Sequence, residues 1–142
     1  MPQEFREGSL SFRYPDNWAL EREPTDHGWT VTLQSPDTAF MTVTVEDDHP
    51  DIEHVAESAL AALREVYPEL EADAAKEFMA GQLAVGHDIQ FFSLDLTNTC
   101  WTRGIHTPEG TALVMWQAND LDLEAAEPVL RAVCASLEVE ED

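Results

Sequence analysis

The chain has 142 residues, of which 44% are hydrophobic, so we expect residues 1–142 to form a single globular domain with its own core. Aspartate and glutamate total 29 against 7 lysines and arginines, which gives a formal net charge of −22 at pH 7. Such a negative surface repels nucleic-acid phosphates and anionic lipids, which excludes these partners. The acidity indicates either solubility, as in a host with a salty or acid-biased proteome, or a partner protein with a basic face.

The sequence predicts neither export nor membrane insertion. Its first seven residues (Met-Pro-Gln-Glu-Phe-Arg-Glu) lack the apolar stretch of a signal peptide. The longest purely apolar run covers residues 112–116, whereas a membrane-spanning helix needs about 20 apolar residues. We therefore expect a cytoplasmic protein without membrane contact. The two cysteines, Cys100 and Cys134, are too few for a disulfide framework, so we expect free thiols.

The first 48 residues predict four strands. Apolar residues at 10, 12 and 14 alternate with polar ones, which is typical of a half-buried strand, and the Pro-Asp-Asn sequence at 15–17 then turns the chain. Similar runs, separated by turn residues, predict the next strands over 18–23, 29–34 and 40–46.

A helix is predicted over residues 51–67. Its apolar residues recur at helical spacing, Asp51 stands at the N-cap position, and Pro68 ends the pattern. The apolar stripe consists of Ile52, Val55, Ala56, Ala59, Leu60, Leu63, Val66 and Tyr67.

The second half predicts further strands and a closing helix. Residues 70–79 fit either a short helix or an edge strand. The helix expected over 122–137 contains Pro128, which either kinks it or starts its second half. The acidic residues 138–142 are expected to form a frayed tail. Strands are predicted over 89–96, 100–107 and 111–118.

Three segments of the chain resemble the PsbP/Mog family. They are residues 8–18, the Gln-Ser-Pro-Asp sequence at 34–37 followed by the strand around 43–45, and Pro128 ahead of a helix that ends in Ala-Ser-Leu at 135–137. The resemblance implies an α+β fold with a single antiparallel sheet of six to eight strands and helices packed against it. It also favours a strand at 70–79. Relatives of this fold include a Ran-binding protein, a photosystem subunit and adaptor chaperones of type VI secretion effectors.

One dense polar cluster stands out, at residues 46–51 with His54 following. Its carboxylates and imidazoles are ligands suited to a divalent cation, but their spacing matches no known metal loop. We therefore interpret the cluster as a solvated turn and helix cap without a specific metal. Its carboxylates form a candidate partner-binding acidic patch: Glu46, Asp47, Asp48 and Asp51.

Two candidate catalytic arrangements contain histidine. A Cys100 nucleophile would need His87 or His106 nearby, and no local signature accompanies the cysteine. His87 next to Asp88 could begin an acid–base pair, but adjacent strand residues point to opposite faces. We assign no catalytic residue.

Two other residue types have a structural interpretation. Arg103 lies on a largely apolar strand, so we expect it to pair with a carboxylate such as Asp95 across a hairpin. The four tryptophans are interpreted as core residues rather than a ligand platform: Trp18, Trp29, Trp101 and Trp116.

The sequence contains no standard enzyme or cofactor-binding motif. We therefore expect a non-enzymatic protein-binding or adaptor module without cofactors, whose partner is another protein. Two alternatives remain: a small metal-dependent hydrolase that uses the acidic loop at 46–54, and an adaptor chaperone for a secretion effector.

Overall fold

The computed structural model describes residues 2–140, which form ten strands and two helices. Their order is β1 (Gln3–Glu7), β2 (Leu10–Tyr14), β3 (Ala19–Thr25), β4 (Gly28–Gln34), β5 (Phe40–Glu46), α1 (Ile52–Val66), β6 (Glu71–Met79), β7 (Gln82–Ser93), β8 (Leu96–Thr107), β9 (Gly110–Asn119), α2 (Leu123–Ala135) and β10 (Glu138–Val139).

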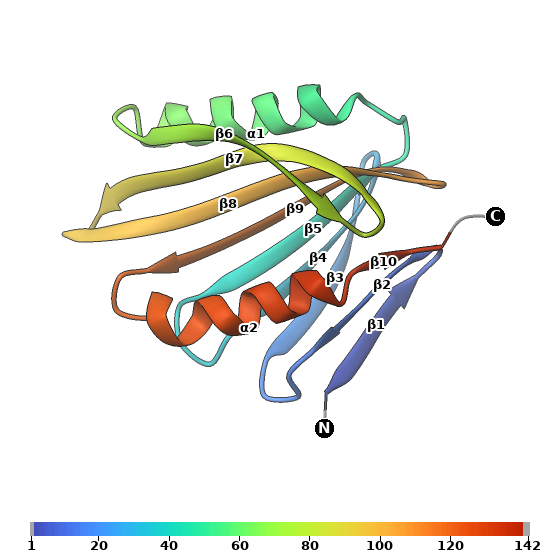
Figure 1. Cartoon of the computed structure of the whole chain (residues 1–142), viewed down its shortest axis with the longest axis horizontal. Coiled ribbons are helices and arrows are strands. Elements are labelled where there is room, and N and C mark those ends of the chain that lie inside the picture. Colours follow the sequence, from blue (N-terminus) through green and yellow to red (C-terminus); the bar gives the residue numbers. More distant parts are fainter. Residues whose placement is uncertain (1, 141–142) are drawn as a thin grey trace.

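Seven strands form one antiparallel sheet in the order β3-β4-β5-β9-β8-β7-β6 (Figure 1). The predicted α+β fold with a single large antiparallel sheet is therefore confirmed. The ambiguous segment 70–79 is strand β6 at the edge of this sheet. A two-residue turn, Ala80-Gly81, joins it to β7, and both turn residues have positive φ angles of 53° and 78°. This hairpin fixes the register of β6 and decides in favour of a strand.

A second, three-stranded sheet in the order β1-β2-β10 corrects the prediction for both ends of the chain. The strand predicted near the N-terminus does not join the large sheet, and β10 lies in the segment predicted as a frayed tail. Leu10 and Phe12 of β2 are buried in the same core as Val31 of the large sheet. The Glu140 N–H also donates to the Ser9 carbonyl at 2.8 Å, which holds the chain end beside β2. Residues 141 and 142 of the predicted tail lie outside the described residues.

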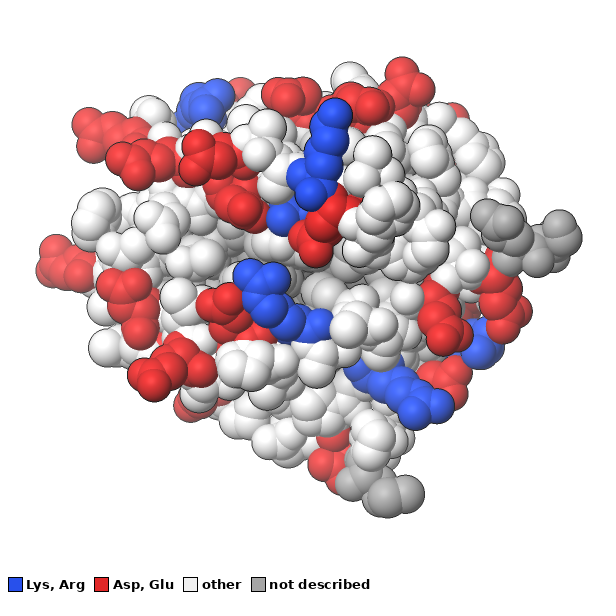
Figure 2. All heavy atoms as spheres, in the orientation of Figure 1, with Lys and Arg blue, Asp and Glu red and all other residues white. Residues whose placement is uncertain are grey.

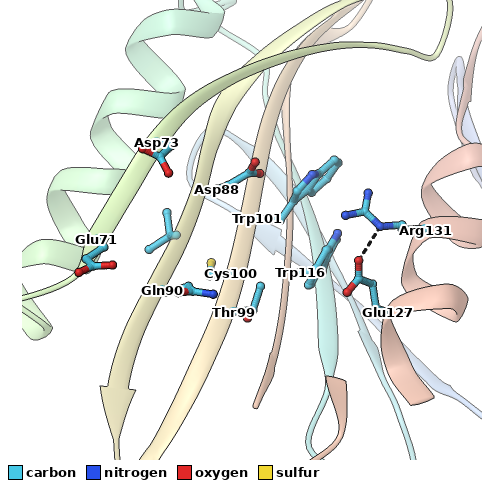
Figure 3. A pocket seen from close by; sticks show the side chains of 11 residues that line it. Glu71, Asp73, Asp88, Gln90, Thr99, Cys100, Trp101, Trp116, Glu127 and Arg131 are labelled. Atoms are coloured by element: carbon cyan, nitrogen blue, oxygen red, sulfur yellow. Dashed lines mark hydrogen bonds and ion pairs between the residues drawn. The ribbon is translucent and has the colours of Figure 1, made fainter. Parts of the chain in front are cut away.

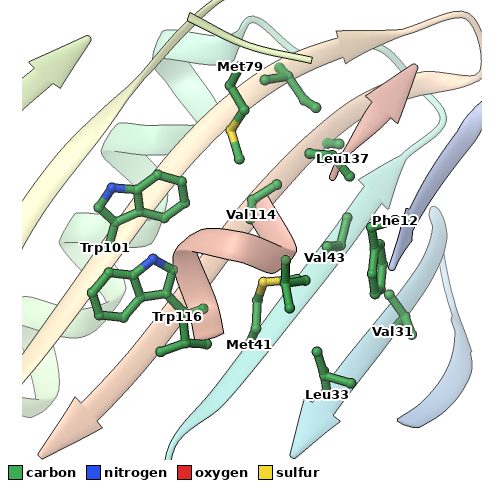
Figure 4. Packing of buried hydrophobic residues seen from close by; sticks show 14 of the residues in the cluster. Phe12, Val31, Leu33, Met41, Val43, Met79, Trp101, Val114, Trp116 and Leu137 are labelled. Atoms are coloured by element: carbon green, nitrogen blue, oxygen red, sulfur yellow. The ribbon is translucent and has the colours of Figure 1, made fainter. Parts of the chain in front are cut away.

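The two helices cover opposite faces of the large sheet (Figure 1). Neighbouring strand residues point to opposite faces, and Cys100 and Trp101 of β8 accordingly belong to two different hydrophobic clusters. α1 packs on β7, β8 and β9 over the smaller cluster. α2 packs on β9 and β2 over the larger cluster, which Figure 4 shows from close by.

The predicted helix ends are correct to within two residues. Asp51 and Asp122 occupy the N-cap positions, but neither side chain caps its own helix. The Asp122 carboxylate instead accepts hydrogen bonds from the backbone N–H and the hydroxyl of Thr38, which ties α2 to the β4–β5 turn. α2 runs through Pro128 without a break. Neither helix within residues 2–140 is long and apolar enough to cross a membrane.

The packing of α2 predicts how much the free energy of unfolding falls when a buried leucine is shortened. Leu130 is fully buried beneath α2, so Leu130→Ala should lower the free energy of unfolding by about 2–5 kcal/mol. Leu121→Ala is a matched control, because Leu121 is 78% exposed in the turn before α2, and it should cost less than about 0.5 kcal/mol. Urea unfolding of both variants measures the difference, and equal costs would contradict the assigned packing.

Candidate functional site

α2 and the small sheet leave part of one face of the large sheet uncovered, where Asp88, Gln90 and Phe92 of β7 are exposed. Here side chains of β6, β7 and β8 border a groove of about 350 Å³, whose opposite wall is α2 (Figure 3). An adjoining hollow of about 230 Å³ shares Trp101, Trp116 and Arg131 with it. Phe92 on the same face of β7 is 76% exposed, as expected where nothing covers the sheet. We call this hollow region the β6–α2 groove.

The strand register determines which side chains face the groove. Asp73 of β6 lies opposite Asp88 of β7, Asp88 opposite Trp101 of β8, and Trp101 opposite Trp116 of β9. These four side chains form one row across four strands, because directly paired residues of antiparallel strands share a face. Glu71, two residues before Asp73, lies on the same face and adds another carboxylate to the β6 side of the groove.

The wall formed by β6 and β7 carries carboxylates in excess of cations. Glu71 and Asp73 make no hydrogen bond or ion pair with any residue of the described chain. On the α2 wall, Glu127 accepts from Arg131 Nε at 2.9 Å. Figure 2 shows a hollow in this region with carboxylates and basic side chains at its margins. The groove therefore has a net negative charge and a fixed acidic side.

Two stacked tryptophans form the floor of the groove. The rings of Trp101 and Trp116 are 5.9 Å apart with an interplanar angle of 17°. Their side chains are 4% and 2% exposed, yet the indole Nε1 of each has no hydrogen-bond partner within residues 2–140. Figure 3 shows the indoles between the acidic wall and Arg131. A buried donor without a partner costs about 1–3 kcal/mol, so each indole N–H is an unfavourable feature of the groove floor.

Arg103 supports this floor from beside the groove. Its side chain is only 4% exposed, and its guanidinium carbon lies 4.3 Å from the centre of the Trp101 ring. Nε donates to Glu77 at 2.7 Å and Nη2 to Asp88 at 3.0 Å. Nη1 donates to the Thr102 carbonyl at 2.7 Å. One cation thus connects β6, β7 and β8.

The predicted pairing of Arg103 with Asp95 is wrong. Asp95 lies in the β7–β8 turn, several pairs away from Arg103 along the hairpin. The residue opposite Arg103 is Gly86, which has no side chain and so leaves the guanidinium free to reach Glu77 on the next strand. A Cβ atom at Gly86 would lie 1.7 Å from the Thr102 carbonyl oxygen, so only glycine fits there.

The acidic patch predicted from the sequence lies elsewhere. Glu46 pairs with Thr111 at the start of β9, whereas Thr99 of the groove pairs with Ala118 near the end of that strand. Pro50 in the loop accepts a hydrogen bond from the Thr111 hydroxyl at 2.5 Å. The side chains of the patch, Glu46, Asp47, Asp48 and Asp51, do not join the groove. Among residues 2–140 no three histidine, cysteine or carboxylate side chains converge to hold a metal ion, His49 and His54 included.

The candidate catalytic residues are separated or inert. Burial raises the pKa of the Cys100 thiol to about 12, so it stays protonated at neutral pH. His87 and Asp88 point to opposite faces as predicted: His87 Nε2 lies 3.4 Å from Glu57 of α1, and Asp88 pairs with Arg103. His106 is exposed, and its backbone N–H and carbonyl both bond to the Gln82 side chain.

Sequence reasoning missed the groove but not all of its residues. Trp101 and Trp116 were correctly assigned to the core, but they also line the groove. The available signal was the spacing of Glu71, Asp73 and Glu77, which alternate with other residues along β6 and so share one face. Sequence alone did not show that this face meets Asp88 and the tryptophans.

The cysteine environments predict slow thiol chemistry. Burial raises the pKa values of both Cys100 and Cys134 to about 12, so Ellman's reagent at pH 8 should react with the folded protein at least about a hundredfold more slowly than in urea. A raised folded pKa means that the native state binds these protons more tightly. Stability should therefore fall as pH rises from about 9 towards 12. Fast labelling of a folded thiol would contradict the assigned burial.

The two arginines of the site should differ in their contribution to stability. Arg103→Met should lower the free energy of unfolding by about 2–3 kcal/mol, because it leaves Glu77 and Asp88 without their cation and removes the hydrogen bond to the Thr102 carbonyl. Arg131→Met should cost less than about 1 kcal/mol, since that side chain is 56% exposed. Thermal and urea unfolding of the two variants provide the comparison, and a larger loss at Arg131 would reverse the assignment.

Comparison with known proteins identifies the fold. No protein-family model matches the sequence, and no curated protein is significantly similar to it. A Bacteroides thetaiotaomicron structure matches 98% of the chain with a TM-score of 0.63 and 13% identity, and the chain spans 48% of that protein. Cyanobacterial PsbP (CyanoP) from Synechocystis sp. PCC 6803 matches 98% with a TM-score of 0.64 and 10% identity, over 92% of its own length. PA94 of Pseudomonas aeruginosa, a protein of unknown function, matches 99% of both chains with a TM-score of 0.59 and 15% identity. The chain therefore has a PsbP/Mog-like fold.

Proposed function

We propose that this protein is a non-enzymatic protein-binding module and that the β6–α2 groove binds a positively charged segment of its partner. The observation that carries the proposal is the combination of unpaired groups in one hollow. Glu71 and Asp73 lack cations, and the buried indole N–H groups of Trp101 and Trp116 lack acceptors.

A basic protein segment supplies the missing cations. Its lysine or arginine side chains pair with the carboxylates of Glu71 and Asp73. The net charge of −22 adds long-range attraction, which raises the association rate with a basic partner and weakens as salt screens it.

The alternatives drawn from the sequence gain less support. The metal-dependent hydrolase would need converging ligands in the 46–54 loop, and the described chain brings no three of them together. An adaptor chaperone for a secretion effector is a narrower form of the protein-binding proposal. It rests on the fold alone, and proteins with one fold have many functions.

Titration calorimetry with a basic peptide tests the proposed site. The probe is an octapeptide of alternating lysine and threonine, acetylated and amidated at its ends, at about 50 mM salt. Combining Glu71→Gln with Asp73→Asn should weaken binding about tenfold, because each exposed ion pair contributes up to about 1 kcal/mol. The control combines Asp47→Asn with Asp48→Asn, which removes the same charge from the acidic loop and should change affinity less than about twofold.

Two results would refute the groove as the site. Equal weakening by both double variants would mean that net charge alone attracts the peptide. If only the Asp47→Asn and Asp48→Asn double variant binds the peptide more weakly, the binding site is the acidic patch and not the groove. Binding of an alternating glutamate and threonine peptide with equal affinity would contradict the charge argument altogether.

A further inference from the structure

β6 is an outer strand of the large sheet, and side chains on one of its faces line the β6–α2 groove. β7 pairs with one side of it, and no strand of residues 2–140 pairs with the other. The residues that flank a two-residue hairpin turn form a hydrogen-bonded pair, here Met79 and Gln82. Bonding then alternates along the strand. The backbone N–H and carbonyl groups that point outward are therefore those of Ala72, Ala74, Lys76 and Phe78.

The opposite edge of the sheet is protected in ways that β6 is not. β3 contains Pro24, which has no N–H to offer. Its Arg22 also pairs with Glu7 of β1 at 2.9 Å, which ties this edge to the small sheet. β6 has nine residues and no proline. It is thus the longer and more accessible edge for an added strand.

The side chains of β6 define what an added strand must look like. On the groove side three of the five are acidic, Glu71, Asp73 and Glu77. On the other side Ala72 and Ala74 are small, Lys76 is exposed, and Phe78 is 82% exposed. A strand paired with β6 would place alternate side chains on these two faces, because side chains of neighbouring strands align across a sheet.

We propose that β6 accepts an extended basic segment of a partner protein as an eighth strand of the large sheet. The segment has lysine or arginine at every second position, facing the groove, and small or apolar residues between them. A second copy of this chain is a poor occupant, because β6 paired with itself would bring its carboxylates together. This inference rests on the proposed function and adds the mode of binding, which is main-chain pairing at the sheet edge.

The test removes an outward N–H without changing any charge. Ala74→Pro deletes one such donor, and proline is tolerated on an edge strand where the N–H faces solvent. It should weaken binding of the alternating lysine and threonine octapeptide about tenfold or more. Ala74→Val is the matched control, because it keeps the N–H and suits a strand, and it should bind within about twofold of the unmodified protein. Calorimetry measures affinity, and thermal unfolding confirms that each variant is folded.

Peptide variants repeat the test on the unmodified protein, which covers the case that Ala74→Pro does not fold. In a strand added to β6, only alternate peptide N–H groups point towards it. N-methylation of either the threonines or the lysines should therefore abolish binding, while N-methylation of the other set is tolerated. For antiparallel addition the threonine amides are the ones that pair, since they lie opposite the outward-facing residues of β6.

The outcomes distinguish a failure of strand addition at β6 from a failure of the proposed function. If both methylated peptides bind normally, or if a folded Ala74→Pro variant does, the strand-addition proposal is wrong. Should Glu71→Gln with Asp73→Asn still weaken binding in that case, the groove as a site for basic segments stands. If the lysine and threonine octapeptide binds neither the unmodified protein nor any variant, both the strand-addition proposal and the proposed function are wrong.

Discussion

The stack of Trp101 on Trp116 is the contact on which the other features of the site depend. It links the central strands β8 and β9, and both rings belong to the large hydrophobic cluster beneath α2. A guanidinium flanks each indole: Arg103 lies 4.3 Å from the centre of the Trp101 ring, and Arg131 lies 6.0 Å from that of Trp116. Such cation–π contacts hold the rings in place. The floor of the groove is therefore part of the core and is fixed before any ligand arrives.

The acidic side of the groove, on β6 and β7, is electrostatically unfavourable, whereas the tryptophan floor is well packed. Asp73 lies directly opposite Asp88, a cross-strand arrangement of like charges that opposes folding. Arg103 relieves Asp88, whereas Asp73 and Glu71 have no cation within the described residues. Unfavourable local choices of this kind tend to occur at functional sites. In the proposed function, a basic partner would convert this repulsion into attraction.

The small sheet determines where the groove lies. β2 contributes Leu10 and Phe12 to the core and, together with α2, covers the half of the sheet formed by β3, β4, β5 and β9. That face stays open only over β6 and the second half of β7, where Glu71, Asp73, Asp88 and Phe92 are exposed. A PsbP/Mog-like fold therefore supplies the frame, and the side chains of β6, β7 and α2 supply the character of the site. The fold alone does not determine what binds there.

The sequence by itself determined the elements and the charge of this protein. Alternation and helical spacing depend on neighbouring residues, so most strands of the large sheet, both helices and the acidic surface follow from local patterns. Strand β6 is the exception, because its pattern also fits a helix and its hairpin with β7 decides. The tertiary structure decided which groups meet. The row of Asp73, Asp88, Trp101 and Trp116 depends on the registers of three strand pairs. The pairing of Arg103 with Glu77 depends on Gly86 leaving space between them. The separate small sheet likewise requires the two ends of the chain to come together. No local pattern encodes these contacts, because each joins residues far apart in the sequence.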